Sequence, residues 1–329
     1  MSRLRVGCVG TGFIAGRHLA ALASFPDVEV VAVADPADGR AREAADRYGA
    51  RAYEDGLDLL AHEELDAVWL CVPPFAHGAL EEAAIARRLP FFVEKPLATD
   101  LDTATAIAAR VRETGLLTAV GYHWRHLDVV QQAADALAGR TVQLAVGHWL
   151  DGTPAAPWWA RRDRSGGQVV EQTTHLFDLA RVLVGEVEAV SAVEVTVPRA
   201  RLPDADVPTA STTTLRFSSG ALGTISSTCA LAWRHRVGLH LVAEDVVVEL
   251  LERGLGDHEL RVRTPAGEQV LPSDQDPVAR EDQEFLDVLR GVGSAVRVSY
   301  DEALRTHALA EAADRSARCG TPVRLAGAG

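Results

Sequence analysis

The chain has 329 residues, which exceeds one typical domain and suits two, and 47% of them are hydrophobic, as in a globular protein with a packed core. Its net charge of −13 argues against a nucleic-acid or anionic-membrane partner, because both favour clustered Lys and Arg. No apolar run approaches the roughly 18–20 residues that span a bilayer. The four cysteines are scattered without C-x-x-C spacing, which indicates free thiols and a cytoplasmic protein.

Residues 1–121 alternate short apolar strands with helices. This rhythm is typical of parallel βαβ units whose sheet is covered by helices on both faces. It predicts an α/β fold with a doubly wound parallel sheet that binds a nucleotide. The expected strands are residues 4–9, 28–34, 66–72, 91–94 and 117–121, and the expected helices are 13–25, 37–48, 76–89 and 101–114.

Residues 122–329 have a different rhythm, in which strand follows strand with few helices between them. Consecutive strands indicate a mostly antiparallel sheet, so we expect a second, α+β domain. Few helices are available to cover this sheet, and its open face is expected to join subunits into a homodimer or homotetramer. The expected strands are 141–150, 187–197, 211–218, 221–230, 237–243 and 246–250, the expected helices include 128–138 and 300–319, and the expected open-face residues are Thr212, Thr214, Ile225 and Val237.

The stretch GTGFIA, residues 10–15, follows the first strand and opens the first helix. Gly10 permits the tight turn, Gly12 lets the backbone approach a pyrophosphate, and Ala15 lets helix and strand pack closely. Asp35 ends the second strand, where a carboxylate accepts hydrogen bonds from a ribose 2′-hydroxyl and repels a 2′-phosphate. The pattern predicts NAD in preference to NADP. A tight strand–helix turn without a ligand is the alternative.

Residues 165–178, SGGQVVEQTTHLFD, place Glu171 four positions before His175 in a helix-like run. On one helix these side chains share a face, with Cβ atoms roughly 5–6 Å apart. The carboxylate can then orient the imidazole and stabilise its protonated form. The pattern indicates a proton-transfer pair, and a structural histidine near a helix acid is the alternative.

Two further stretches, CVPPFAH at 71–77 and VEKPLA at 93–98, each follow an expected strand. Together with the glycine turn and the G-G…H-x-x-D segment, they resemble the Gfo/Idh/MocA oxidoreductases, the family of glucose–fructose oxidoreductase and the inositol dehydrogenases. The resemblance covers almost the full length. It implies a Rossmann domain at 1–121 that binds NAD and a substrate-binding and oligomerisation domain at 122–329. The positions matched to the cofactor site are Gly10, Thr11, Gly12, Phe13, Ile14, Asp35, Val72, Pro73, His77, Glu94 and Lys95.

The resemblance also implies hydride transfer with a secondary alcohol or ketone of a sugar, cyclitol or related polyol. It assigns catalysis to Lys95, Glu171 and His175, with Glu171 standing where the family usually has aspartate. Lys95 can donate a hydrogen bond to the developing alkoxide, and His175 can take and return the hydroxyl proton. For Trp158, stacking on a sugar and plain packing both remain open. The expected substrate-site residues are Lys95, His123, Trp158, Glu171, Thr174 and His175.

Two other functions share this fold and cofactor. One is an NAD-dependent glycosidase that uses redox transiently, and the other is a catalytically silent NAD-binding protein, against which Lys95 and His175 argue. The histidines show no H-x-x-x-H spacing and no matching acid cluster, so no metal is expected. We also expect a cis peptide bond between Lys95 and Pro96.

Overall fold

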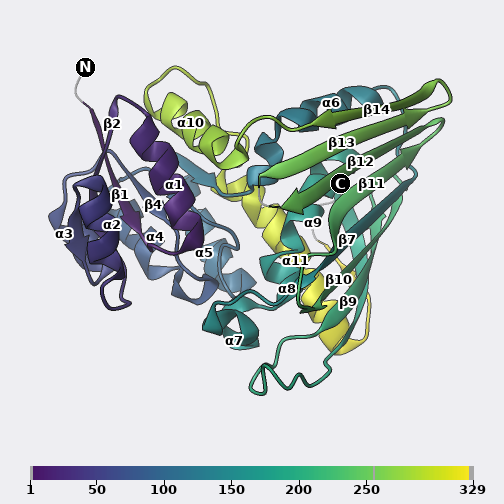
Figure 1. Ribbon diagram of the computed structural model, residues 1–329, viewed down its shortest axis with the longest axis horizontal. Helices are drawn as coiled ribbons and strands as arrows, with labels where there is room; N and C mark the ends of the chain where they lie inside the picture. The colour runs from purple at the N-terminus through teal and green to yellow at the C-terminus, as the bar shows by residue number, and fades with distance from the viewer. Residues whose placement is uncertain (1–2, 255, 326–329) are drawn as a thin grey trace. The chain divides into compact units, whose positions relative to one another are not determined.

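The computed structural model describes residues 3–254 and 256–325, which form two compact units (Figure 1). The first unit comprises Met1–His123 and Val278–Leu304, and the second comprises Trp124–Pro277 and Arg305–Gly329. The chain therefore leaves the first unit after residue 123 and returns to it for residues 278–304. The sequence pattern places one boundary after residue 121 and contains no signal for this return.

The first unit contains a six-stranded sheet in the order β3-β2-β1-β4-β5-β6, with every neighbouring pair parallel. This confirms the predicted doubly wound fold. Its central strands are short and apolar, and all residues of β4 and β5 are buried, as expected for a sheet covered on both faces. The sequence pattern misses β3, because its three residues form no apolar run. The strands are β1 (Leu4–Val9), β2 (Val28–Ala34), β3 (Arg51–Tyr53), β4 (Ala67–Leu70), β5 (Phe91–Val93) and β6 (Thr118–Val120).

Helices α1 to α5 connect these strands, and α10 joins the same unit from a distant part of the sequence. Asp55 and Asp100 are the N-caps of α3 and α5, and each side chain accepts a backbone N–H of the first turn. Phe285 of α10 packs edge-on against Trp69 of β4, with ring centroids 5.3 Å apart. Helix α10 therefore completes the core of the first unit. The helices are α1 (Phe13–Ser24), α2 (Arg40–Tyr48), α3 (Gly56–His62), α4 (Ala79–Ala86), α5 (Leu101–Thr114) and α10 (Pro277–Leu289).

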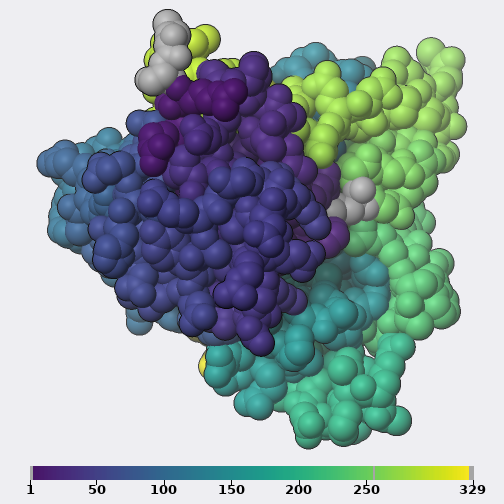
Figure 2. Space-filling view, turned by 60° about the vertical axis from the view of Figure 1, so that its left-hand side comes forward, coloured from purple at the N-terminus to yellow at the C-terminus, as the bar shows by residue number. Residues whose placement is uncertain are grey.

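The second unit contains a nine-stranded sheet in the order β14-β13-β12-β11-β7-β10-β9-β8-β15. Only β7 and β10 pair in parallel, which confirms the predicted mostly antiparallel sheet. The sequence pattern misses β13 to β15. Strand β14 is exposed along most of its length, and Figure 2 shows this light-green segment at the surface. The strands are β7 (Leu144–Gly152), β8 (Val187–Val195), β9 (Ala210–Phe217), β10 (Leu222–Leu231), β11 (Arg236–Ala243), β12 (Val246–Gly254), β13 (Asp257–Thr264), β14 (Gly267–Pro272) and β15 (Val323–Arg324).

Helices α6, α9 and α11 cover one face of this sheet, and their apolar side chains form one core with the inner residues of β7, β10, β11 and β12 (Figure 1). Within the described residues, no helix covers the other face. Thr212 and Thr214 lie on that open face, as expected, whereas the placement of Ile225 and Val237 there is wrong. Both are 1% exposed, because strand side chains alternate and these two point to the helices. The helices are α6 (Asp128–Leu137), α7 (Arg162–Ser165), α8 (Gln168–Glu171), α9 (Thr174–Val184) and α11 (Tyr300–Cys319).

The helices of the described residues include none with the length and apolar character needed to cross a membrane. The longest, α11, has 20 residues, and it carries several acidic and basic side chains along its length. Its apolar residues belong to the cores of the two units instead.

Candidate active site

The residues predicted to bind the cofactor follow the carboxyl ends of the parallel strands in the first unit. Gly10 follows β1, Asp35 follows β2, Val72 follows β4, and Glu94 follows β5. Because the strands are parallel, these ends lie along one edge of the sheet. From β1, strands β2 and β3 follow on one side of the sheet, whereas β4, β5 and β6 follow on the other. Open α/β sheets bind ligands in the crevice at such a switch point, here between β1 and β4.

The turn between β1 and α1 has the shape that a pyrophosphate requires. Gly10 has φ +88°, and a Cβ there would lie 2.2 Å from the carbonyl oxygen of Cys71, so no larger residue fits. A Cβ added at Gly12 would meet no atom within 4 Å, which leaves open space beside the backbone. No side chain caps the start of α1, so its first N–H groups can bind an anion. Phe13 is 78% exposed and Ile14 is half-buried.

Asp35 is fixed beside this turn by three hydrogen bonds. The backbone N–H and the hydroxyl of Thr11 both donate to Oδ2 at 2.9 Å, and the backbone N–H of Ala37 donates to Oδ1 at 2.9 Å. A carboxylate accepts about four hydrogen bonds, so acceptor capacity remains for a ribose hydroxyl. The first unit therefore fits a dinucleotide at both its phosphates and its ribose.

The segment after β4 carries Val72 and Pro73, both half-buried, and the buried His77. His77 Nδ1 lies 2.5 Å from Oε1 of Glu81, whose Oε2 accepts the backbone N–H of Gly78 at 2.6 Å. If Nδ1 donates to the carboxylate, Nε2 is the acceptor nitrogen of the neutral ring. His77 lies just before α4 and Glu81 lies in its first turn. The motif analysis overlooked this i, i+4 pair.

The stretch Glu94-Lys95-Pro96 follows β5. Glu94 is 3% exposed, and its Oε2 accepts the backbone N–H of Lys95 at 3.1 Å. The Lys95–Pro96 bond is cis, as predicted. Of the 33 Lys and Arg residues in the chain, Lys95 is the single lysine. All the other residues of this set are arginines, so the compact ammonium at this strand end stands out in the composition. The motif analysis missed this signal.

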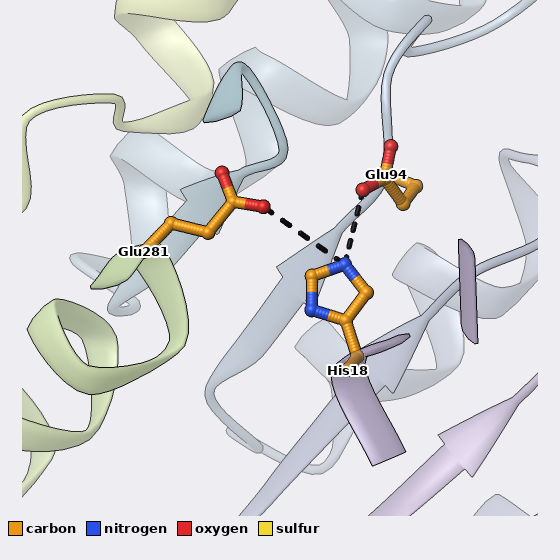
Figure 3. Close-up of side chains that lie close together, drawn as sticks. All are labelled: His18, Glu94 and Glu281. Atoms are coloured by element: carbon orange, nitrogen blue, oxygen red, sulfur yellow. Dashed lines mark hydrogen bonds and ion pairs between the residues drawn. The ribbon is translucent and has the colours of Figure 1, made fainter. Parts of the chain in front are cut away.

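A buried cluster around His18 was also missed. His18 lies on α1, and its two ring nitrogens contact Asp282 and Glu94. Figure 3 shows Glu94 and Glu281 approaching the same ring nitrogen. His18, Glu94 and Glu281 bring ligand-type atoms within 4.8 Å of one another, a grouping that the search for local metal motifs could not detect. These three residues are 76 or more positions apart in the sequence. The one signal of the cluster in the sequence was a histidine on the buried face of α1.

In the second unit, Glu171 and His175 do not share one helix, which corrects the expected arrangement. Glu171 ends α8, His175 belongs to α9, and residues 172–173 form a turn between them. The backbone N–H of His175 bonds to the carbonyl of Gln172, three residues back, instead of that of Glu171. The turn is held by tertiary contacts, since the hydroxyl of Thr173 lies 2.7 Å from that of Ser227 on β10.

His175 packs against two tryptophans, whose own ring centroids are 6.0 Å apart. The ring is 3% exposed, and its centroid lies 6.2 Å from that of Trp124 and 5.9 Å from that of Trp149, with interplanar angles of 18° and 20°. Because both indole rings lie nearly parallel to the imidazole ring, they restrict its rotation. Neither tryptophan was expected near the candidate base, because both are distant from it in sequence.

Glu171 is tied to the loop that follows β7. Its Oε2 accepts the indole N–H of Trp159 at 2.6 Å, and Trp159 is buried beside Val207 and Cys229. The neighbouring Trp158 is half-buried. Of the other predicted substrate residues, Thr174 is fully buried at the start of α9, and His123, in the first unit, is 6% exposed.

One turn beyond His175, Asp178 anchors α9 by a buried ion pair. Arg125 donates from Nε and Nη2 to the two carboxylate oxygens, each at 2.6 Å, and the hydroxyl of Thr306 donates to Oδ1 at 2.7 Å. Arg181, on the next turn of α9, donates to the same hydroxyl at 2.5 Å. Asp178 stood inside the quoted stretch 165–178 without a role, and the structure gives it one.

The second unit also has a cavity of about 430 Å³, outside the predicted site. Its walls are formed by residues 152–157, 160–161, 201–205 and 231–232, and none of the predicted site residues lines it. The cavity therefore does not define the candidate active site.

Comparison with known proteins decides the family. The model described as "Oxidoreductase family, NAD-binding Rossmann fold" matches residues 4–122, and the model "GFO/IDH/MocA C-terminal domain" matches residues 130–248. The myo-inositol 2-dehydrogenase of Thermotoga maritima is 30% identical over 230 residues, 68% of each chain. The chain belongs to the Gfo/Idh/MocA family. It is an NAD-binding oxidoreductase.

This Gfo/Idh/MocA protein is similar over nearly its whole length to the inositol 2-dehydrogenase of Rhizobium meliloti. The two are 28% identical over 326 residues, which is 95% of this chain and 96% of that one. Among solved structures, levoglucosan dehydrogenase in complex with NADH and levoglucosan shares the fold, with a TM-score of 0.86, 21% identity and coverage of 98% and 99%. The predicted family, the oxidoreductase class and NAD as cofactor are confirmed.

Proposed function

We propose that this Gfo/Idh/MocA protein transfers hydride between NAD and a secondary alcohol or ketone of a sugar, cyclitol or related polyol. The main observation that supports this proposal is the position of Lys95. The only lysine of the chain lies at the same carboxyl edge of the sheet as the Gly10 turn and Asp35. The inositol 2-dehydrogenase named above, similar over 95% of this chain, supports the substrate class.

The first unit is proposed to hold the cofactor. The turn at Thr11 and Gly12 and the start of α1 would bind the pyrophosphate, and Asp35 would accept the ribose hydroxyls. Residues 72–77 would line the nicotinamide end, with Glu94 shaping the turn after β5. When bound, NAD supplies the hydride acceptor or donor.

The second unit is proposed to hold most of the substrate and to move the proton. His175 accepts the hydroxyl proton when the alcohol is oxidised and returns it when the ketone is reduced, and Lys95 donates a hydrogen bond to the oxygen as it gains charge. Glu171 holds Trp159 and so places the loop that carries Trp158. This is a different role from the direct pairing with His175 that the spacing suggests.

We expect NAD to bind at least several-fold tighter than NADP. The carboxylate of Asp35 accepts ribose hydroxyls and repels a 2′-phosphate, and its position is fixed by Thr11 and Ala37. Calorimetry with both cofactors measures this, and Asp35→Ser should narrow the difference. Equal or reversed affinities in the unmodified protein would contradict the assignment.

A panel of sugars and inositols followed at the nicotinamide absorbance tests the reaction, since a glycosidase would release sugar without a net absorbance change.

The open face of the nine-stranded sheet is proposed to join subunits. Its exposed apolar side chains include Leu144, Val193, Val195 and Leu222. Burial, together with the nearby charges of His240 and Arg236, lowers the pKa of His148 to about 4, so this ring on the same face is neutral at pH 7. Such a face fits a self-complementary contact.

Light scattering is therefore expected to give a dimer or tetramer at micromolar concentration. Val146→Asp, in the middle of the open face, should shift the mass towards the monomer, because it places a charge in the contact. Val292→Asp is the control, since Val292 is 77% exposed and lies in the first unit. A monomeric mass for the unmodified protein would refute the proposed assembly.

A further inference from the structure

His18 is an imidazole enclosed entirely by the first unit. It is 0% exposed, and its Nδ1 lies 2.7 Å from Oδ1 of Asp282. Its Nε2 lies 3.0 Å from Oε1 of Glu94 (Figure 3). Glu281 approaches Nε2 at 4.0 Å. Burial raises the pKa of Asp282, and its contacts with His18 and with the indole N–H of Trp69 oppose that rise. When both carboxylates are ionised they can only accept hydrogen bonds, and each ring nitrogen then donates. A ring that donates from both nitrogens is an imidazolium.

The charges around the ring agree with this geometry. Burial by itself lowers the pKa of His18, but Asp282 and Glu94 outweigh it and raise that pKa well above its ordinary value. The nearby Cys71 stays a neutral thiol, because its contact with Cys8, its burial and the same carboxylates raise its pKa. The stabilisation from His18 is complete below its unfolded pKa and is lost as pH rises through the folded pKa.

Glu94 transmits the position of His18 to Lys95. One carboxylate oxygen of Glu94 bonds to His18, and the other accepts the backbone N–H of Lys95 at 3.1 Å. Gly121 bounds the same carboxylate, since a Cβ there would lie 2.4 Å from Oε1. The indole N–H of Trp69 donates to Asp282 Oδ1 at 2.8 Å and fixes the far end of the chain of contacts. The order is Trp69, Asp282, His18, Glu94, Lys95.

We propose that His18, held as an imidazolium between Asp282 and Glu94, is a positioning residue that fixes the turn carrying Lys95. It touches neither substrate nor cofactor and acts through the carboxylate of Glu94. The catalytic consequence rests on the proposed function, in which Lys95 donates a hydrogen bond to the reacting oxygen. The structural consequence, a fixed position of Lys95, does not depend on the proposed function.

The protonation state is tested on the unmodified protein. Nitrogen-15 NMR of the histidine side chains should show a ring with both nitrogens protonated at pH 7 to 8, and this signal should vanish in His18→Gln. A neutral His18 ring at pH 7 would overturn the proposal. So would a stoichiometric metal ion in the purified protein that is lost in His18→Gln, because it would make His18, Glu94 and Glu281 ligands.

The single lysine makes the positioning step directly visible without any substrate. Protein labelled with carbon-13 at the lysine ε-carbon should give one side-chain resonance, that of Lys95. We expect this resonance to shift or split in His18→Gln and in Asp282→Asn, and to stay unchanged in His62→Gln, an exposed histidine at the end of α3. An unchanged Lys95 resonance in both cluster variants overturns the proposal.

A double-mutant cycle then tests the catalytic consequence. His18→Gln should lower kcat by on the order of 10²-fold, as a small misplacement of a reacting group does. It should not lower kcat further when Lys95 is already alanine, because His18 acts through Lys95. Equal losses in both backgrounds would show a merely structural role. If no polyol reacts, the proposed function fails, while the two NMR results still decide the position of Lys95.

Discussion

His175→Ala is expected to lower kcat by roughly 10²–10⁴-fold on the true substrate, the usual range for a general acid–base residue. Dissociation of NAD should barely change, because the residues proposed to hold its phosphates and ribose belong to the first unit. Stopped-flow measurement of NADH formation gives the hydride-transfer rate, and calorimetry gives the NAD affinity. Glu171→Gln should cost less, since its carboxylate contacts Trp159 and its amide can still accept that hydrogen bond.

The ring of His175 also packs against two indoles, so a matched set of variants is needed. His175→Gln keeps much of the volume and loses the imidazole, and it should be as impaired as the alanine variant. His235→Ala, at an exposed histidine of the second unit, should be fully active. Near-normal turnover by His175→Ala would mean that the proton leaves by another route, with Lys95 the next candidate.

Asp178→Ala is expected to lower the free energy of unfolding by about 3–5 kcal/mol. Arg125 is 9% exposed, and Asp178→Ala removes the carboxylate that pairs with this buried guanidinium through two hydrogen bonds. Urea denaturation followed by tryptophan fluorescence measures the loss, since Trp124 lies in the same core.

The comparison is with an exposed pair of the same unit. Asp257→Ala removes one of the two acidic partners of Arg253, the other being Glu259. Both side chains of the Arg253–Asp257 pair are more than half exposed, so the free energy of unfolding should change little. Replacing Arg125 with Met together with Asp178→Leu should recover part of the stability, because no buried charge is then left unpaired. Equal losses for Asp178→Ala and Asp257→Ala would show that the buried pair does not hold α9.

The parts of the site that could be predicted are those whose geometry is local. The turn at Gly10 and Gly12 is specified by residues adjacent in sequence, because the shape of a strand–helix turn depends on its own backbone angles. Asp35 was found for a similar reason, since it ends the strand that follows. The apolar runs of the first 121 residues gave the parallel sheet through the periodicity of buried strands.

The parts that could not be predicted depend on distant contacts. The helix between Glu171 and His175 is interrupted because Thr173 and Gln168 bond to β10, and a spacing rule contains no information about such contacts. The same holds for His18 and Asp282, which are 264 positions apart. The sequence placed Ile225 in a strand but did not show which of the alternating side chains of that strand face the helices. The face was therefore assigned wrongly.

The return of residues 278–304 to the first unit has a consequence for biosynthesis. A chain emerging from the ribosome can form β1 to β6 early, but His18 remains without Asp282, and the surface formed by Trp69 and Phe92 remains without Phe285. Both gaps close only when α10 has been translated, after strands β7 to β14 of the nine-stranded sheet. The cofactor unit is thus begun first and finished late, and the half-made chain carries an uncovered aromatic patch while residues 124–276 of the second unit are synthesised.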